Sequence, residues 1–326
     1  MSKHKSKPFL PLHTTQILVL LMKLIVVFAA LFFIYYKLTS NNTLDVKQFL
    51  KYLDDYNIIT LKNVFILICL SGINWLLESF KWQVLVHNIA PLSVTTAIEQ
   101  SLGSLTASLI TPNRIGEYGA KAIYYPKPLR KKILGLTLIG NLAQLSVTLI
   151  LGCVGLSYVV CQFNLAISFT NILLGALVLG TMILIYHWFF SKNKFEIKGY
   201  SFQKLKTFTS DLNQYTVYKT IGISTVRYIC FSHQFYVLLW LFNVNVSYLD
   251  AIALITSMYI IASIIPTVFI FDVVIKGSVA VWLFSLVNAN EFIIVTCATL
   301  MWLLNFALPS IIGSYFVLNF KLPTKE

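Results

Sequence analysis

The sequence predicts an all-α polytopic membrane protein, organised as a single integral membrane domain over residues 1–326. The chain is 57% hydrophobic and only 11% charged, with a mean hydropathy of +0.77, whereas soluble domains carry roughly 25% charged residues. It contains several apolar runs of about 20 residues, enough to cross a hydrocarbon layer of ~30 Å. Its formal net charge of +13 gathers in a few loops, as the positive-inside rule predicts. Because no basic patch with interleaved aromatic residues is present, we expect no nucleic-acid partner.

The first element is a span at 17–38, whose only interior charge is Lys23. Its apolar run is longer than the core of a signal peptide, so we expect it to remain in the mature protein. The polar stretch 39–60 has apolar residues at helical spacing and is predicted to lie along the membrane surface. Further full spans are predicted at 61–80, 133–160, 171–190, 220–242 and 292–318, which brings the number of crossings to six.

The basic residues predict the orientation of the chain. We expect the cytoplasmic side to hold both termini, the 126–132 turn and the 191–219 loop. At the end of the second span, Trp75, Lys81 and Trp82 have the composition of the interface belt, where tryptophan and lysine are common.

Two segments are interrupted in a way that full spans avoid. The segment at 94–125 contains Thr111-Pro112-Asn113-Arg114-Ile115-Gly116-Glu117, and the segment at 250–287 contains Pro266. Proline and buried charge in hydrocarbon are tolerated only where the freed backbone groups find partners. We therefore predict two broken re-entrant hairpins, one opening to each side of the membrane. Such a pair is what an inverted repeat produces, with halves at about 17–160 and 220–318.

Each interrupted segment places an acid and a base one helical turn apart. Glu117 precedes Lys121 by four residues, and Asp272 precedes Lys276 by four. One interpretation is that these i,i+4 pairs only neutralise each other. The other is a central polar cavity, where Arg114 and the N-termini of half-helices attract an anion. Arginine suits phosphate because its planar fork donates two parallel hydrogen bonds.

Two more charges fall inside predicted spans. Arg227 is about five residues into its span and could extend to the cytoplasmic face, while Glu78 could pair with Lys81 near the interface. No metal ligand set or redox motif is seen, and no cofactor is expected. The candidate substrate-binding residues are Glu78, Arg114, Glu117, Lys121, Arg227, Asp272 and Lys276, and the candidate structural breaks are Pro112, Gly116 and Pro266.

The segment Thr111 to Glu117, together with Asn74-Trp75-Leu76-Leu77-Glu78-Ser79-Phe80-Lys81-Trp82, resembles the flippase-like transmembrane domain of lysylphosphatidylglycerol synthases. The first half of that family shows a proline, an arginine and then Gly-Glu. The second half shows a proline and glycines followed by an acid and a base. Here Pro266, Asp272, Lys276 and Gly277 fit that second pattern, but Thr267-Val268-Phe269 stands where a glycine pair is common.

The resemblance implies a stand-alone relative, located in a bacterial inner membrane, that translocates or binds an anionic or aminoacylated phospholipid without modifying it. The family's aminoacyl-transfer domain has no counterpart here, so a separate lipid-modifying enzyme is a possible partner and no catalytic activity is expected. One alternative is a membrane-embedded transferase that uses a polyprenyl-phosphate donor, with Asp54 and Asp55 binding a metal. The other is a scaffold without transport. The oligomeric state stays open.

Overall fold

The computed structural model describes residues 46–109, 111, 114–165, 213–264 and 272–321, together with positions 21, 24, 25, 28 and 32. This part of the chain forms helices and no strand, in agreement with the predicted all-α class. The helices are α2 (Val46–Asp55), α3 (Leu61–Val86), α4 (Val94–Ser108), α5 (Ile115–Ile123), α6 (Lys127–Gln162), α9 (Gln214–Leu241), α10 (Tyr248–Ile264), α11 (Asp272–Ser285), α12 (Glu291–Trp302), η3 (Leu303–Ala307) and α13 (Leu308–Asn319).

Within these residues, three helices are long and apolar enough to cross a membrane. They are α3, α6 and the continuous run Glu291–Asn319, and they contain the spans predicted at 61–80, 133–160 and 292–318. The segment predicted as a span at 220–242 is helical and belongs to α9, but α9 is not among these three helices. The spans predicted at 17–38 and 171–190 lie outside the described residues, apart from the isolated positions in the first. These helices are compatible with a membrane protein.

Two predicted boundaries were wrong. The basic stretch 127–132, predicted as a turn, is the beginning of α6. Pro128 stands in the first turn of that helix, where its missing N–H costs no hydrogen bond. The end of the predicted loop 191–219 is also helical, because α9 begins at Gln214, and the Asn213 side chain caps it by accepting from Tyr215 N at 3.0 Å.

The first interrupted segment is a pair of short helices. At 1.5 Å per residue, α4 is about 22 Å long and α5 about 13 Å, both shorter than a ~30 Å hydrocarbon layer. Thr111 joins them, because its hydroxyl donates to Ser108 O and accepts from Gly116 N, each at 2.8 Å. A Cβ on Gly116 would lie 2.7 Å from Ala107 O. The backbone therefore approaches itself at Gly116, as predicted for a break residue, whereas Pro112 lies outside the described residues.

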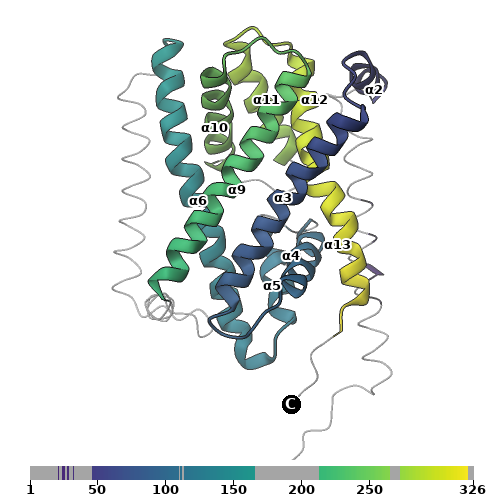
Figure 1. Cartoon of the computed structure of the whole chain (residues 1–326), viewed down its shortest axis with the longest axis vertical. Coiled ribbons are helices and arrows are strands. Elements are labelled where there is room, and N and C mark those ends of the chain that lie inside the picture. Colours follow the sequence, from purple (N-terminus) through teal and green to yellow (C-terminus); the bar gives the residue numbers. More distant parts are fainter. Residues whose placement is uncertain are drawn as a thin grey trace, which may run out of the picture.

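The second interrupted segment has the same organisation. Helix α10 ends at Ile264 and α11 begins at Asp272, and the two pack together. The connection 265–271, with Pro266, lies outside the described residues. In Figure 1, the α4–α5 pair lies in the lower half of the molecule and the α10–α11 pair in the upper half, with α3 and α9 crossing both.

The helix contacts of the two halves are reciprocal. Helices α3 and α9 pack against each other, α4 packs against α13 of the second half, and α10 packs against α6 of the first half. Glycine allows the close approach in both places. A Cβ on Gly155 of α6 would collide with Thr256 of α10, and a Cβ on Gly313 of α13 would collide with Leu102 O of α4. Small residues at helix crossings are typical of membrane helix bundles.

The last long helix contains one π-helical turn, η3, between α12 and α13. Pro309 follows it and has no N–H to offer the carbonyl four residues earlier, that of Asn305. The indole N–H of Trp75 donates to this carbonyl instead, at 3.0 Å, and the Ser71 hydroxyl donates to the neighbouring carbonyl of Leu304. The turn is thereby tied to the middle of α3.

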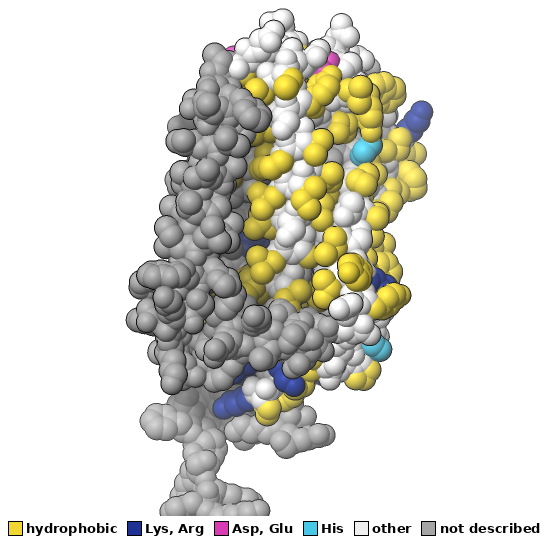
Figure 2. All heavy atoms as spheres, turned by 90° about the vertical axis from the view of Figure 1, so that its left-hand side faces the viewer, with side chains coloured by type: hydrophobic (Ala, Val, Ile, Leu, Met, Phe, Trp, Pro, Cys, Tyr) yellow, Lys and Arg dark blue, Asp and Glu magenta, His cyan; other side chains and the backbone are white. Residues whose placement is uncertain are grey.

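The described surface is largely apolar. Figure 2 shows hydrophobic side chains over most of the described part of one long face, with the visible lysine and arginine residues mainly near its lower end and right-hand edge. Helix α2 lies at one end of the bundle and buries Phe49 and Leu53 on one face, so the stretch 39–60, predicted from the helical spacing of its apolar residues, contains a helix.

Candidate functional site

A buried cluster of ionised side chains joins α3, α5 and α9. Glu78 is at its centre: one carboxylate oxygen lies 2.7 Å from Lys81 Nζ and 2.8 Å from Arg227 Nη1, and the other lies 4.0 Å from Lys121 Nζ. Glu78 and Lys81 are one helical turn apart on α3, whereas Arg227 comes from the second half of the chain. The carboxylate of Glu78 therefore links the two halves.

Helix α5 contributes the second carboxylate of the cluster. Glu117 Oε1 accepts a hydrogen bond from Lys121 Nζ at 2.8 Å, which is the predicted i,i+4 pair. The Arg114 Nη2 atom lies 3.9 Å from Glu117 Oε2. Since Lys121 also approaches Glu78, the two acid–base pairs of α3 and α5 form one continuous network.

Burial makes this network energetically demanding. The side chains of Lys81 and Lys121 are 2% and 3% exposed, and those of Glu78 and Glu117 are each 8% exposed. An unpaired charge so buried costs several kcal/mol, so ions at such positions must have partners. Arg227 is 14% exposed and bonded at depth, so the interpretation that it extends to the cytoplasmic face was wrong. Lys81, Trp75 and Trp82, which have the composition of the interface belt, are all buried in the described part of the chain.

Positive charge exceeds negative charge among the described members of the cluster. Lys81, Lys121, Arg114 and Arg227 carry four positive charges against the two of Glu78 and Glu117, a formal excess of two. Arg114 is the most accessible of the four cations, with 32% of its side chain exposed. Its Nε is nevertheless buried and donates no hydrogen bond to the described chain. The cluster thus combines excess positive charge with an unused arginine donor.

The backbone at Arg114 is unusual. Arg114 has φ of 57°, in the left-handed region, and four asparagines are the other non-glycine residues with positive φ in the described part of the chain. Asparagine tolerates this region far better than a long side chain does. The conformation sets Arg114 at the N-terminus of α5, where the positive end of the helix dipole also favours an anion.

Uncharged amides hold Arg227 and the π-helical turn around the cluster. Arg227 Nε donates to Asn74 Oδ1 at 2.9 Å, and Arg227 Nη1 donates to Gln144 Oε1 at 3.2 Å. Asn74 Nδ2 in turn donates to Asn305 Oδ1 at 2.7 Å, and Asn305 Nδ2 donates to Gln234 Oε1 at 2.9 Å. These bonds connect α3, α6, α9 and the π-helical turn into one polar layer.

Aromatic rings lie beside the cations. Lys121 Nζ is 4.3 Å from the ring centre of Trp82, and Arg227 Cζ is 5.9 Å from that of Trp75. Phe306, in the π-helical turn, has Arg114 Cζ at 5.5 Å and Lys276 Nζ at 5.6 Å from its ring centre. Arg114 and Lys276 come from the two interrupted hairpins, so both hairpins bring a cation to the same ring.

The predicted site residues therefore fall into two groups. Glu78, Arg114, Glu117, Lys121 and Arg227 form one network, and Lys276 joins it through Phe306. Asp272 is the first residue of α11, and its side chain is outside the description.

Sequence reasoning did not include Lys81, Asn74, Gln144 or Asn305 among the site residues. The i,i+3 spacing of Glu78 and Lys81 was a usable signal for the first of these. The amides gave none, because a single asparagine or glutamine in an apolar helix does not reveal its partner.

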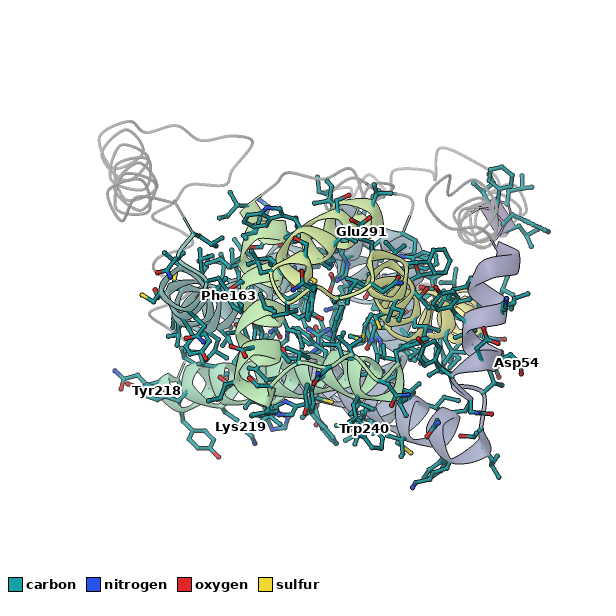
Figure 3. All side chains as sticks on the ribbon, turned by 90° about the horizontal axis from the view of Figure 1, so that it is seen from above. Asp54, Phe163, Tyr218, Lys219, Trp240 and Glu291 are labelled. Carbon is teal, nitrogen blue, oxygen red and sulfur yellow. The ribbon has the colours of Figure 1, made fainter. Side chains whose placement is uncertain are left out.

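The other sites considered lie away from this cluster. Asp54 and Asp55 are exposed at the end of α2, and Figure 3 shows Asp54 at the rim of the bundle. A hollow of about 910 Å³ between α11 and α12 includes Glu291 but none of the clustered charges. A smaller groove of about 230 Å³ lies between α3, α4 and α13 and includes Trp75.

No protein-family model matches the chain, and no curated protein matches it. The resemblance to the flippase-like domain of lysylphosphatidylglycerol synthases therefore stays a prediction based on the quoted residues.

Proposed function

We propose that this protein is a flippase-like lipid translocase or lipid-binding transporter, and that the buried cluster binds the anionic headgroup of a membrane phospholipid. The observation that carries the proposal is the formal excess of two positive charges among the described members of a buried network that joins α3, α5 and α9. In a low-dielectric interior such an excess favours the entry of an anion.

Arg114 is the residue we assign to phosphate. It is the most accessible cation of the cluster, its Nε has no hydrogen-bond partner in the described chain, and it stands at the N-terminus of α5. A phosphate here would accept from the guanidinium fork and would lie at the positive end of the helix dipole. Lys121 and Lys276 would add charge, while Glu117 would balance Arg114 and Lys121 when no lipid is bound.

The topology that we propose has six crossings, both termini in the cytoplasm and two re-entrant hairpins of opposite orientation. The reciprocal packing of α4 on α13 and of α10 on α6 supports an inverted repeat. The short lengths of α4, α5 and α11 support hairpins that enter the membrane without crossing it. Alternating access would then consist of one half moving against the other around the cluster. The location is a bacterial inner membrane, with a separate lipid-modifying enzyme as partner.

Reconstituted vesicles test the proposal directly. Fluorescent phosphatidylglycerol is placed in both leaflets, and the outer pool is bleached by a membrane-impermeant reductant. The wild type is expected to expose the inner pool, and Arg114→Ala is expected to slow this at least tenfold. Lys219→Ala is the matched control, because Lys219 is an exposed cation on α9 outside the cluster. Equal rates for wild type and Arg114→Ala at equal protein content would remove Arg114 from the mechanism.

A further inference from the structure

The groove between α3, α4 and α13 is a second feature of the molecule that the headgroup site does not use. Its volume is about 230 Å³. On α3 its lining residues recur at helical spacing, with Ile68, Gly72, Trp75, Leu76 and Ser79 on one side of the helix. Leu308 and Ile312 of α13 form the opposite wall, and both are exposed.

The groove is apolar in its chemistry even where it contains serine. The Ser71 hydroxyl donates to the carbonyl of Leu304, and the Ser79 hydroxyl donates to Trp75 O at 2.9 Å. Both hydroxyl protons are therefore already used, and the side chains offer a ligand mainly methyl, methylene and aromatic surface. Such a groove favours an apolar chain over a polar solute.

Trp75 connects this groove to the charged cluster. Its indole lines the groove, Arg227 Cζ lies 5.9 Å from its ring centre, and its N–H is held by Asn305 O. Ser79 also lines the groove and is the chain neighbour of Glu78, the central carboxylate of the cluster. The apolar groove and the cation-rich cluster thus meet at Trp75.

We propose that this groove holds one acyl chain of the phospholipid whose anionic headgroup binds the cluster. The inference rests on the proposed function and adds where the tail lies. Only an amphiphile with a negatively charged head and an apolar tail matches both surfaces at once. A phospholipid presents its headgroup and its apolar tail to these two surfaces at once, which a soluble anion cannot do.

Gly72 allows the groove to be blocked without disturbing the fold. A Cβ at Gly72 would meet no heavy atom within 4 Å, so a side chain can start there without a backbone clash, and the indole of Gly72→Trp is expected to occupy the groove. Gly222 of α9 is equally open, which makes Gly222→Trp a matched control outside the groove. The probe is phosphatidylglycerol with a photoreactive diazirine in one acyl chain, in nanodiscs, with adducts mapped by mass spectrometry.

In the wild type we expect adducts on the groove residues of α3 and α13 at least fivefold above those on Ile150 and Val154, which are exposed apolar positions on α6. Gly72→Trp should remove this enrichment, and Gly222→Trp should keep it. The same photoreactive chain on phosphatidylcholine should label the groove at least threefold less. Groove labelling no higher than on α6, labelling unchanged by Gly72→Trp, or equal labelling by both lipids would each overturn the proposal.

The lipid-transfer and labelling results together show whether the assignment of the acyl chain to the groove or the assignment of the headgroup to Arg114 is incorrect. If lipid transfer by Arg114→Ala equals that of the wild type while the groove stays enriched and selective, the assignment of Arg114 fails and the groove stands. If transfer depends on Arg114 but the groove is not enriched, the groove alone is overturned.

Discussion

Replacing the central carboxylate by its neutral isostere is the most informative perturbation of the cluster. Glu78→Gln keeps the shape of the side chain but removes the counter-charge for Lys81 at 2.7 Å, Arg227 at 2.8 Å and Lys121 at 4.0 Å. The formal excess of positive charge among the described members rises from two to three. Removing one partner of a buried ion pair costs about 3–5 kcal/mol, because the other charge stays buried without compensation.

Thermal unfolding in a mild, uncharged detergent measures this cost. At about 2–4 °C per kcal/mol for a domain of 150–250 residues, we expect the midpoint of Glu78→Gln to fall by roughly 6–20 °C. Glu291→Gln is the control, because Glu291 is exposed in the first turn of α12 and its loss costs about 1 kcal/mol or less. Combining Glu78→Gln with Lys81→Met removes one uncompensated cation and should restore part of the midpoint.

Added phosphatidylglycerol should stabilise Glu78→Gln more than the wild type, since the vacated cations become available to the phosphate. Phosphatidylcholine should stabilise both proteins equally. If Glu78→Gln unfolds at the wild-type temperature, or if its response to the two lipids is identical, the network around Glu78 does not behave as a set of uncompensated buried charges and the reasoning fails.

Three further experiments test the fold around the cluster and the proposed topology. Gly116→Ala should destabilise the protein by about 1–3 kcal/mol, because the new Cβ would lie 2.7 Å from Ala107 O. Gly119→Ala is the control and should not destabilise it, because a Cβ there meets nothing within 4 Å. Equal unfolding midpoints for the two variants would contradict the close approach at Gly116. Asn305→Leu should cost about 2–4 kcal/mol in the same assay, since the buried Gln234 Oε1 and Asn74 Nδ2 each lose the hydrogen bond that they make to Asn305; a midpoint within 1 °C of the wild type would refute that role. For the proposed topology, tags at the two ends of the chain should both be inaccessible to protease added outside intact cells, and cleavage of only one tag would rule out an even number of crossings.

The interruptions and the local charge pairs could be predicted from the sequence because both depend on neighbours along the chain. Thr111 to Gly116 combines residues that a continuous membrane helix avoids, and the structure ends α4 at Ser108 and starts α5 at Ile115. The pair of Glu117 and Lys121 follows from the helical period alone.

The partners contributed by distant helices could not be predicted in this way. Lys81 lies among tryptophans, which is also the composition of an interface, and only the packing of other helices shows that it is buried and shares the Glu78 carboxylate with Arg227 of α9. Asn305 is one polar residue in an apolar run, and its importance depends on bonds to Asn74 and Gln234, each on another helix. Long-range hydrogen bonds leave no periodic trace in the sequence.

The π-helical turn at Leu303–Ala307 also affects how the chain tolerates changes in length. Compared with an uninterrupted α-helix of the same sequence, the extra residue in that turn rotates the following residues by about 100° around the helix axis, which is the rotation that one residue makes in an α-helix. One continuous rod can therefore direct α12 toward α11 and α13 toward α4. Loss of a single amino acid within this turn would convert it to an ordinary α-helical turn and leave Gly313 facing Leu102, whereas the same loss between the turn and Gly313 would turn Gly313 away. Changes in the length of this helix should accordingly be tolerated at the π-helical turn, while the rest of the helix should vary by substitution.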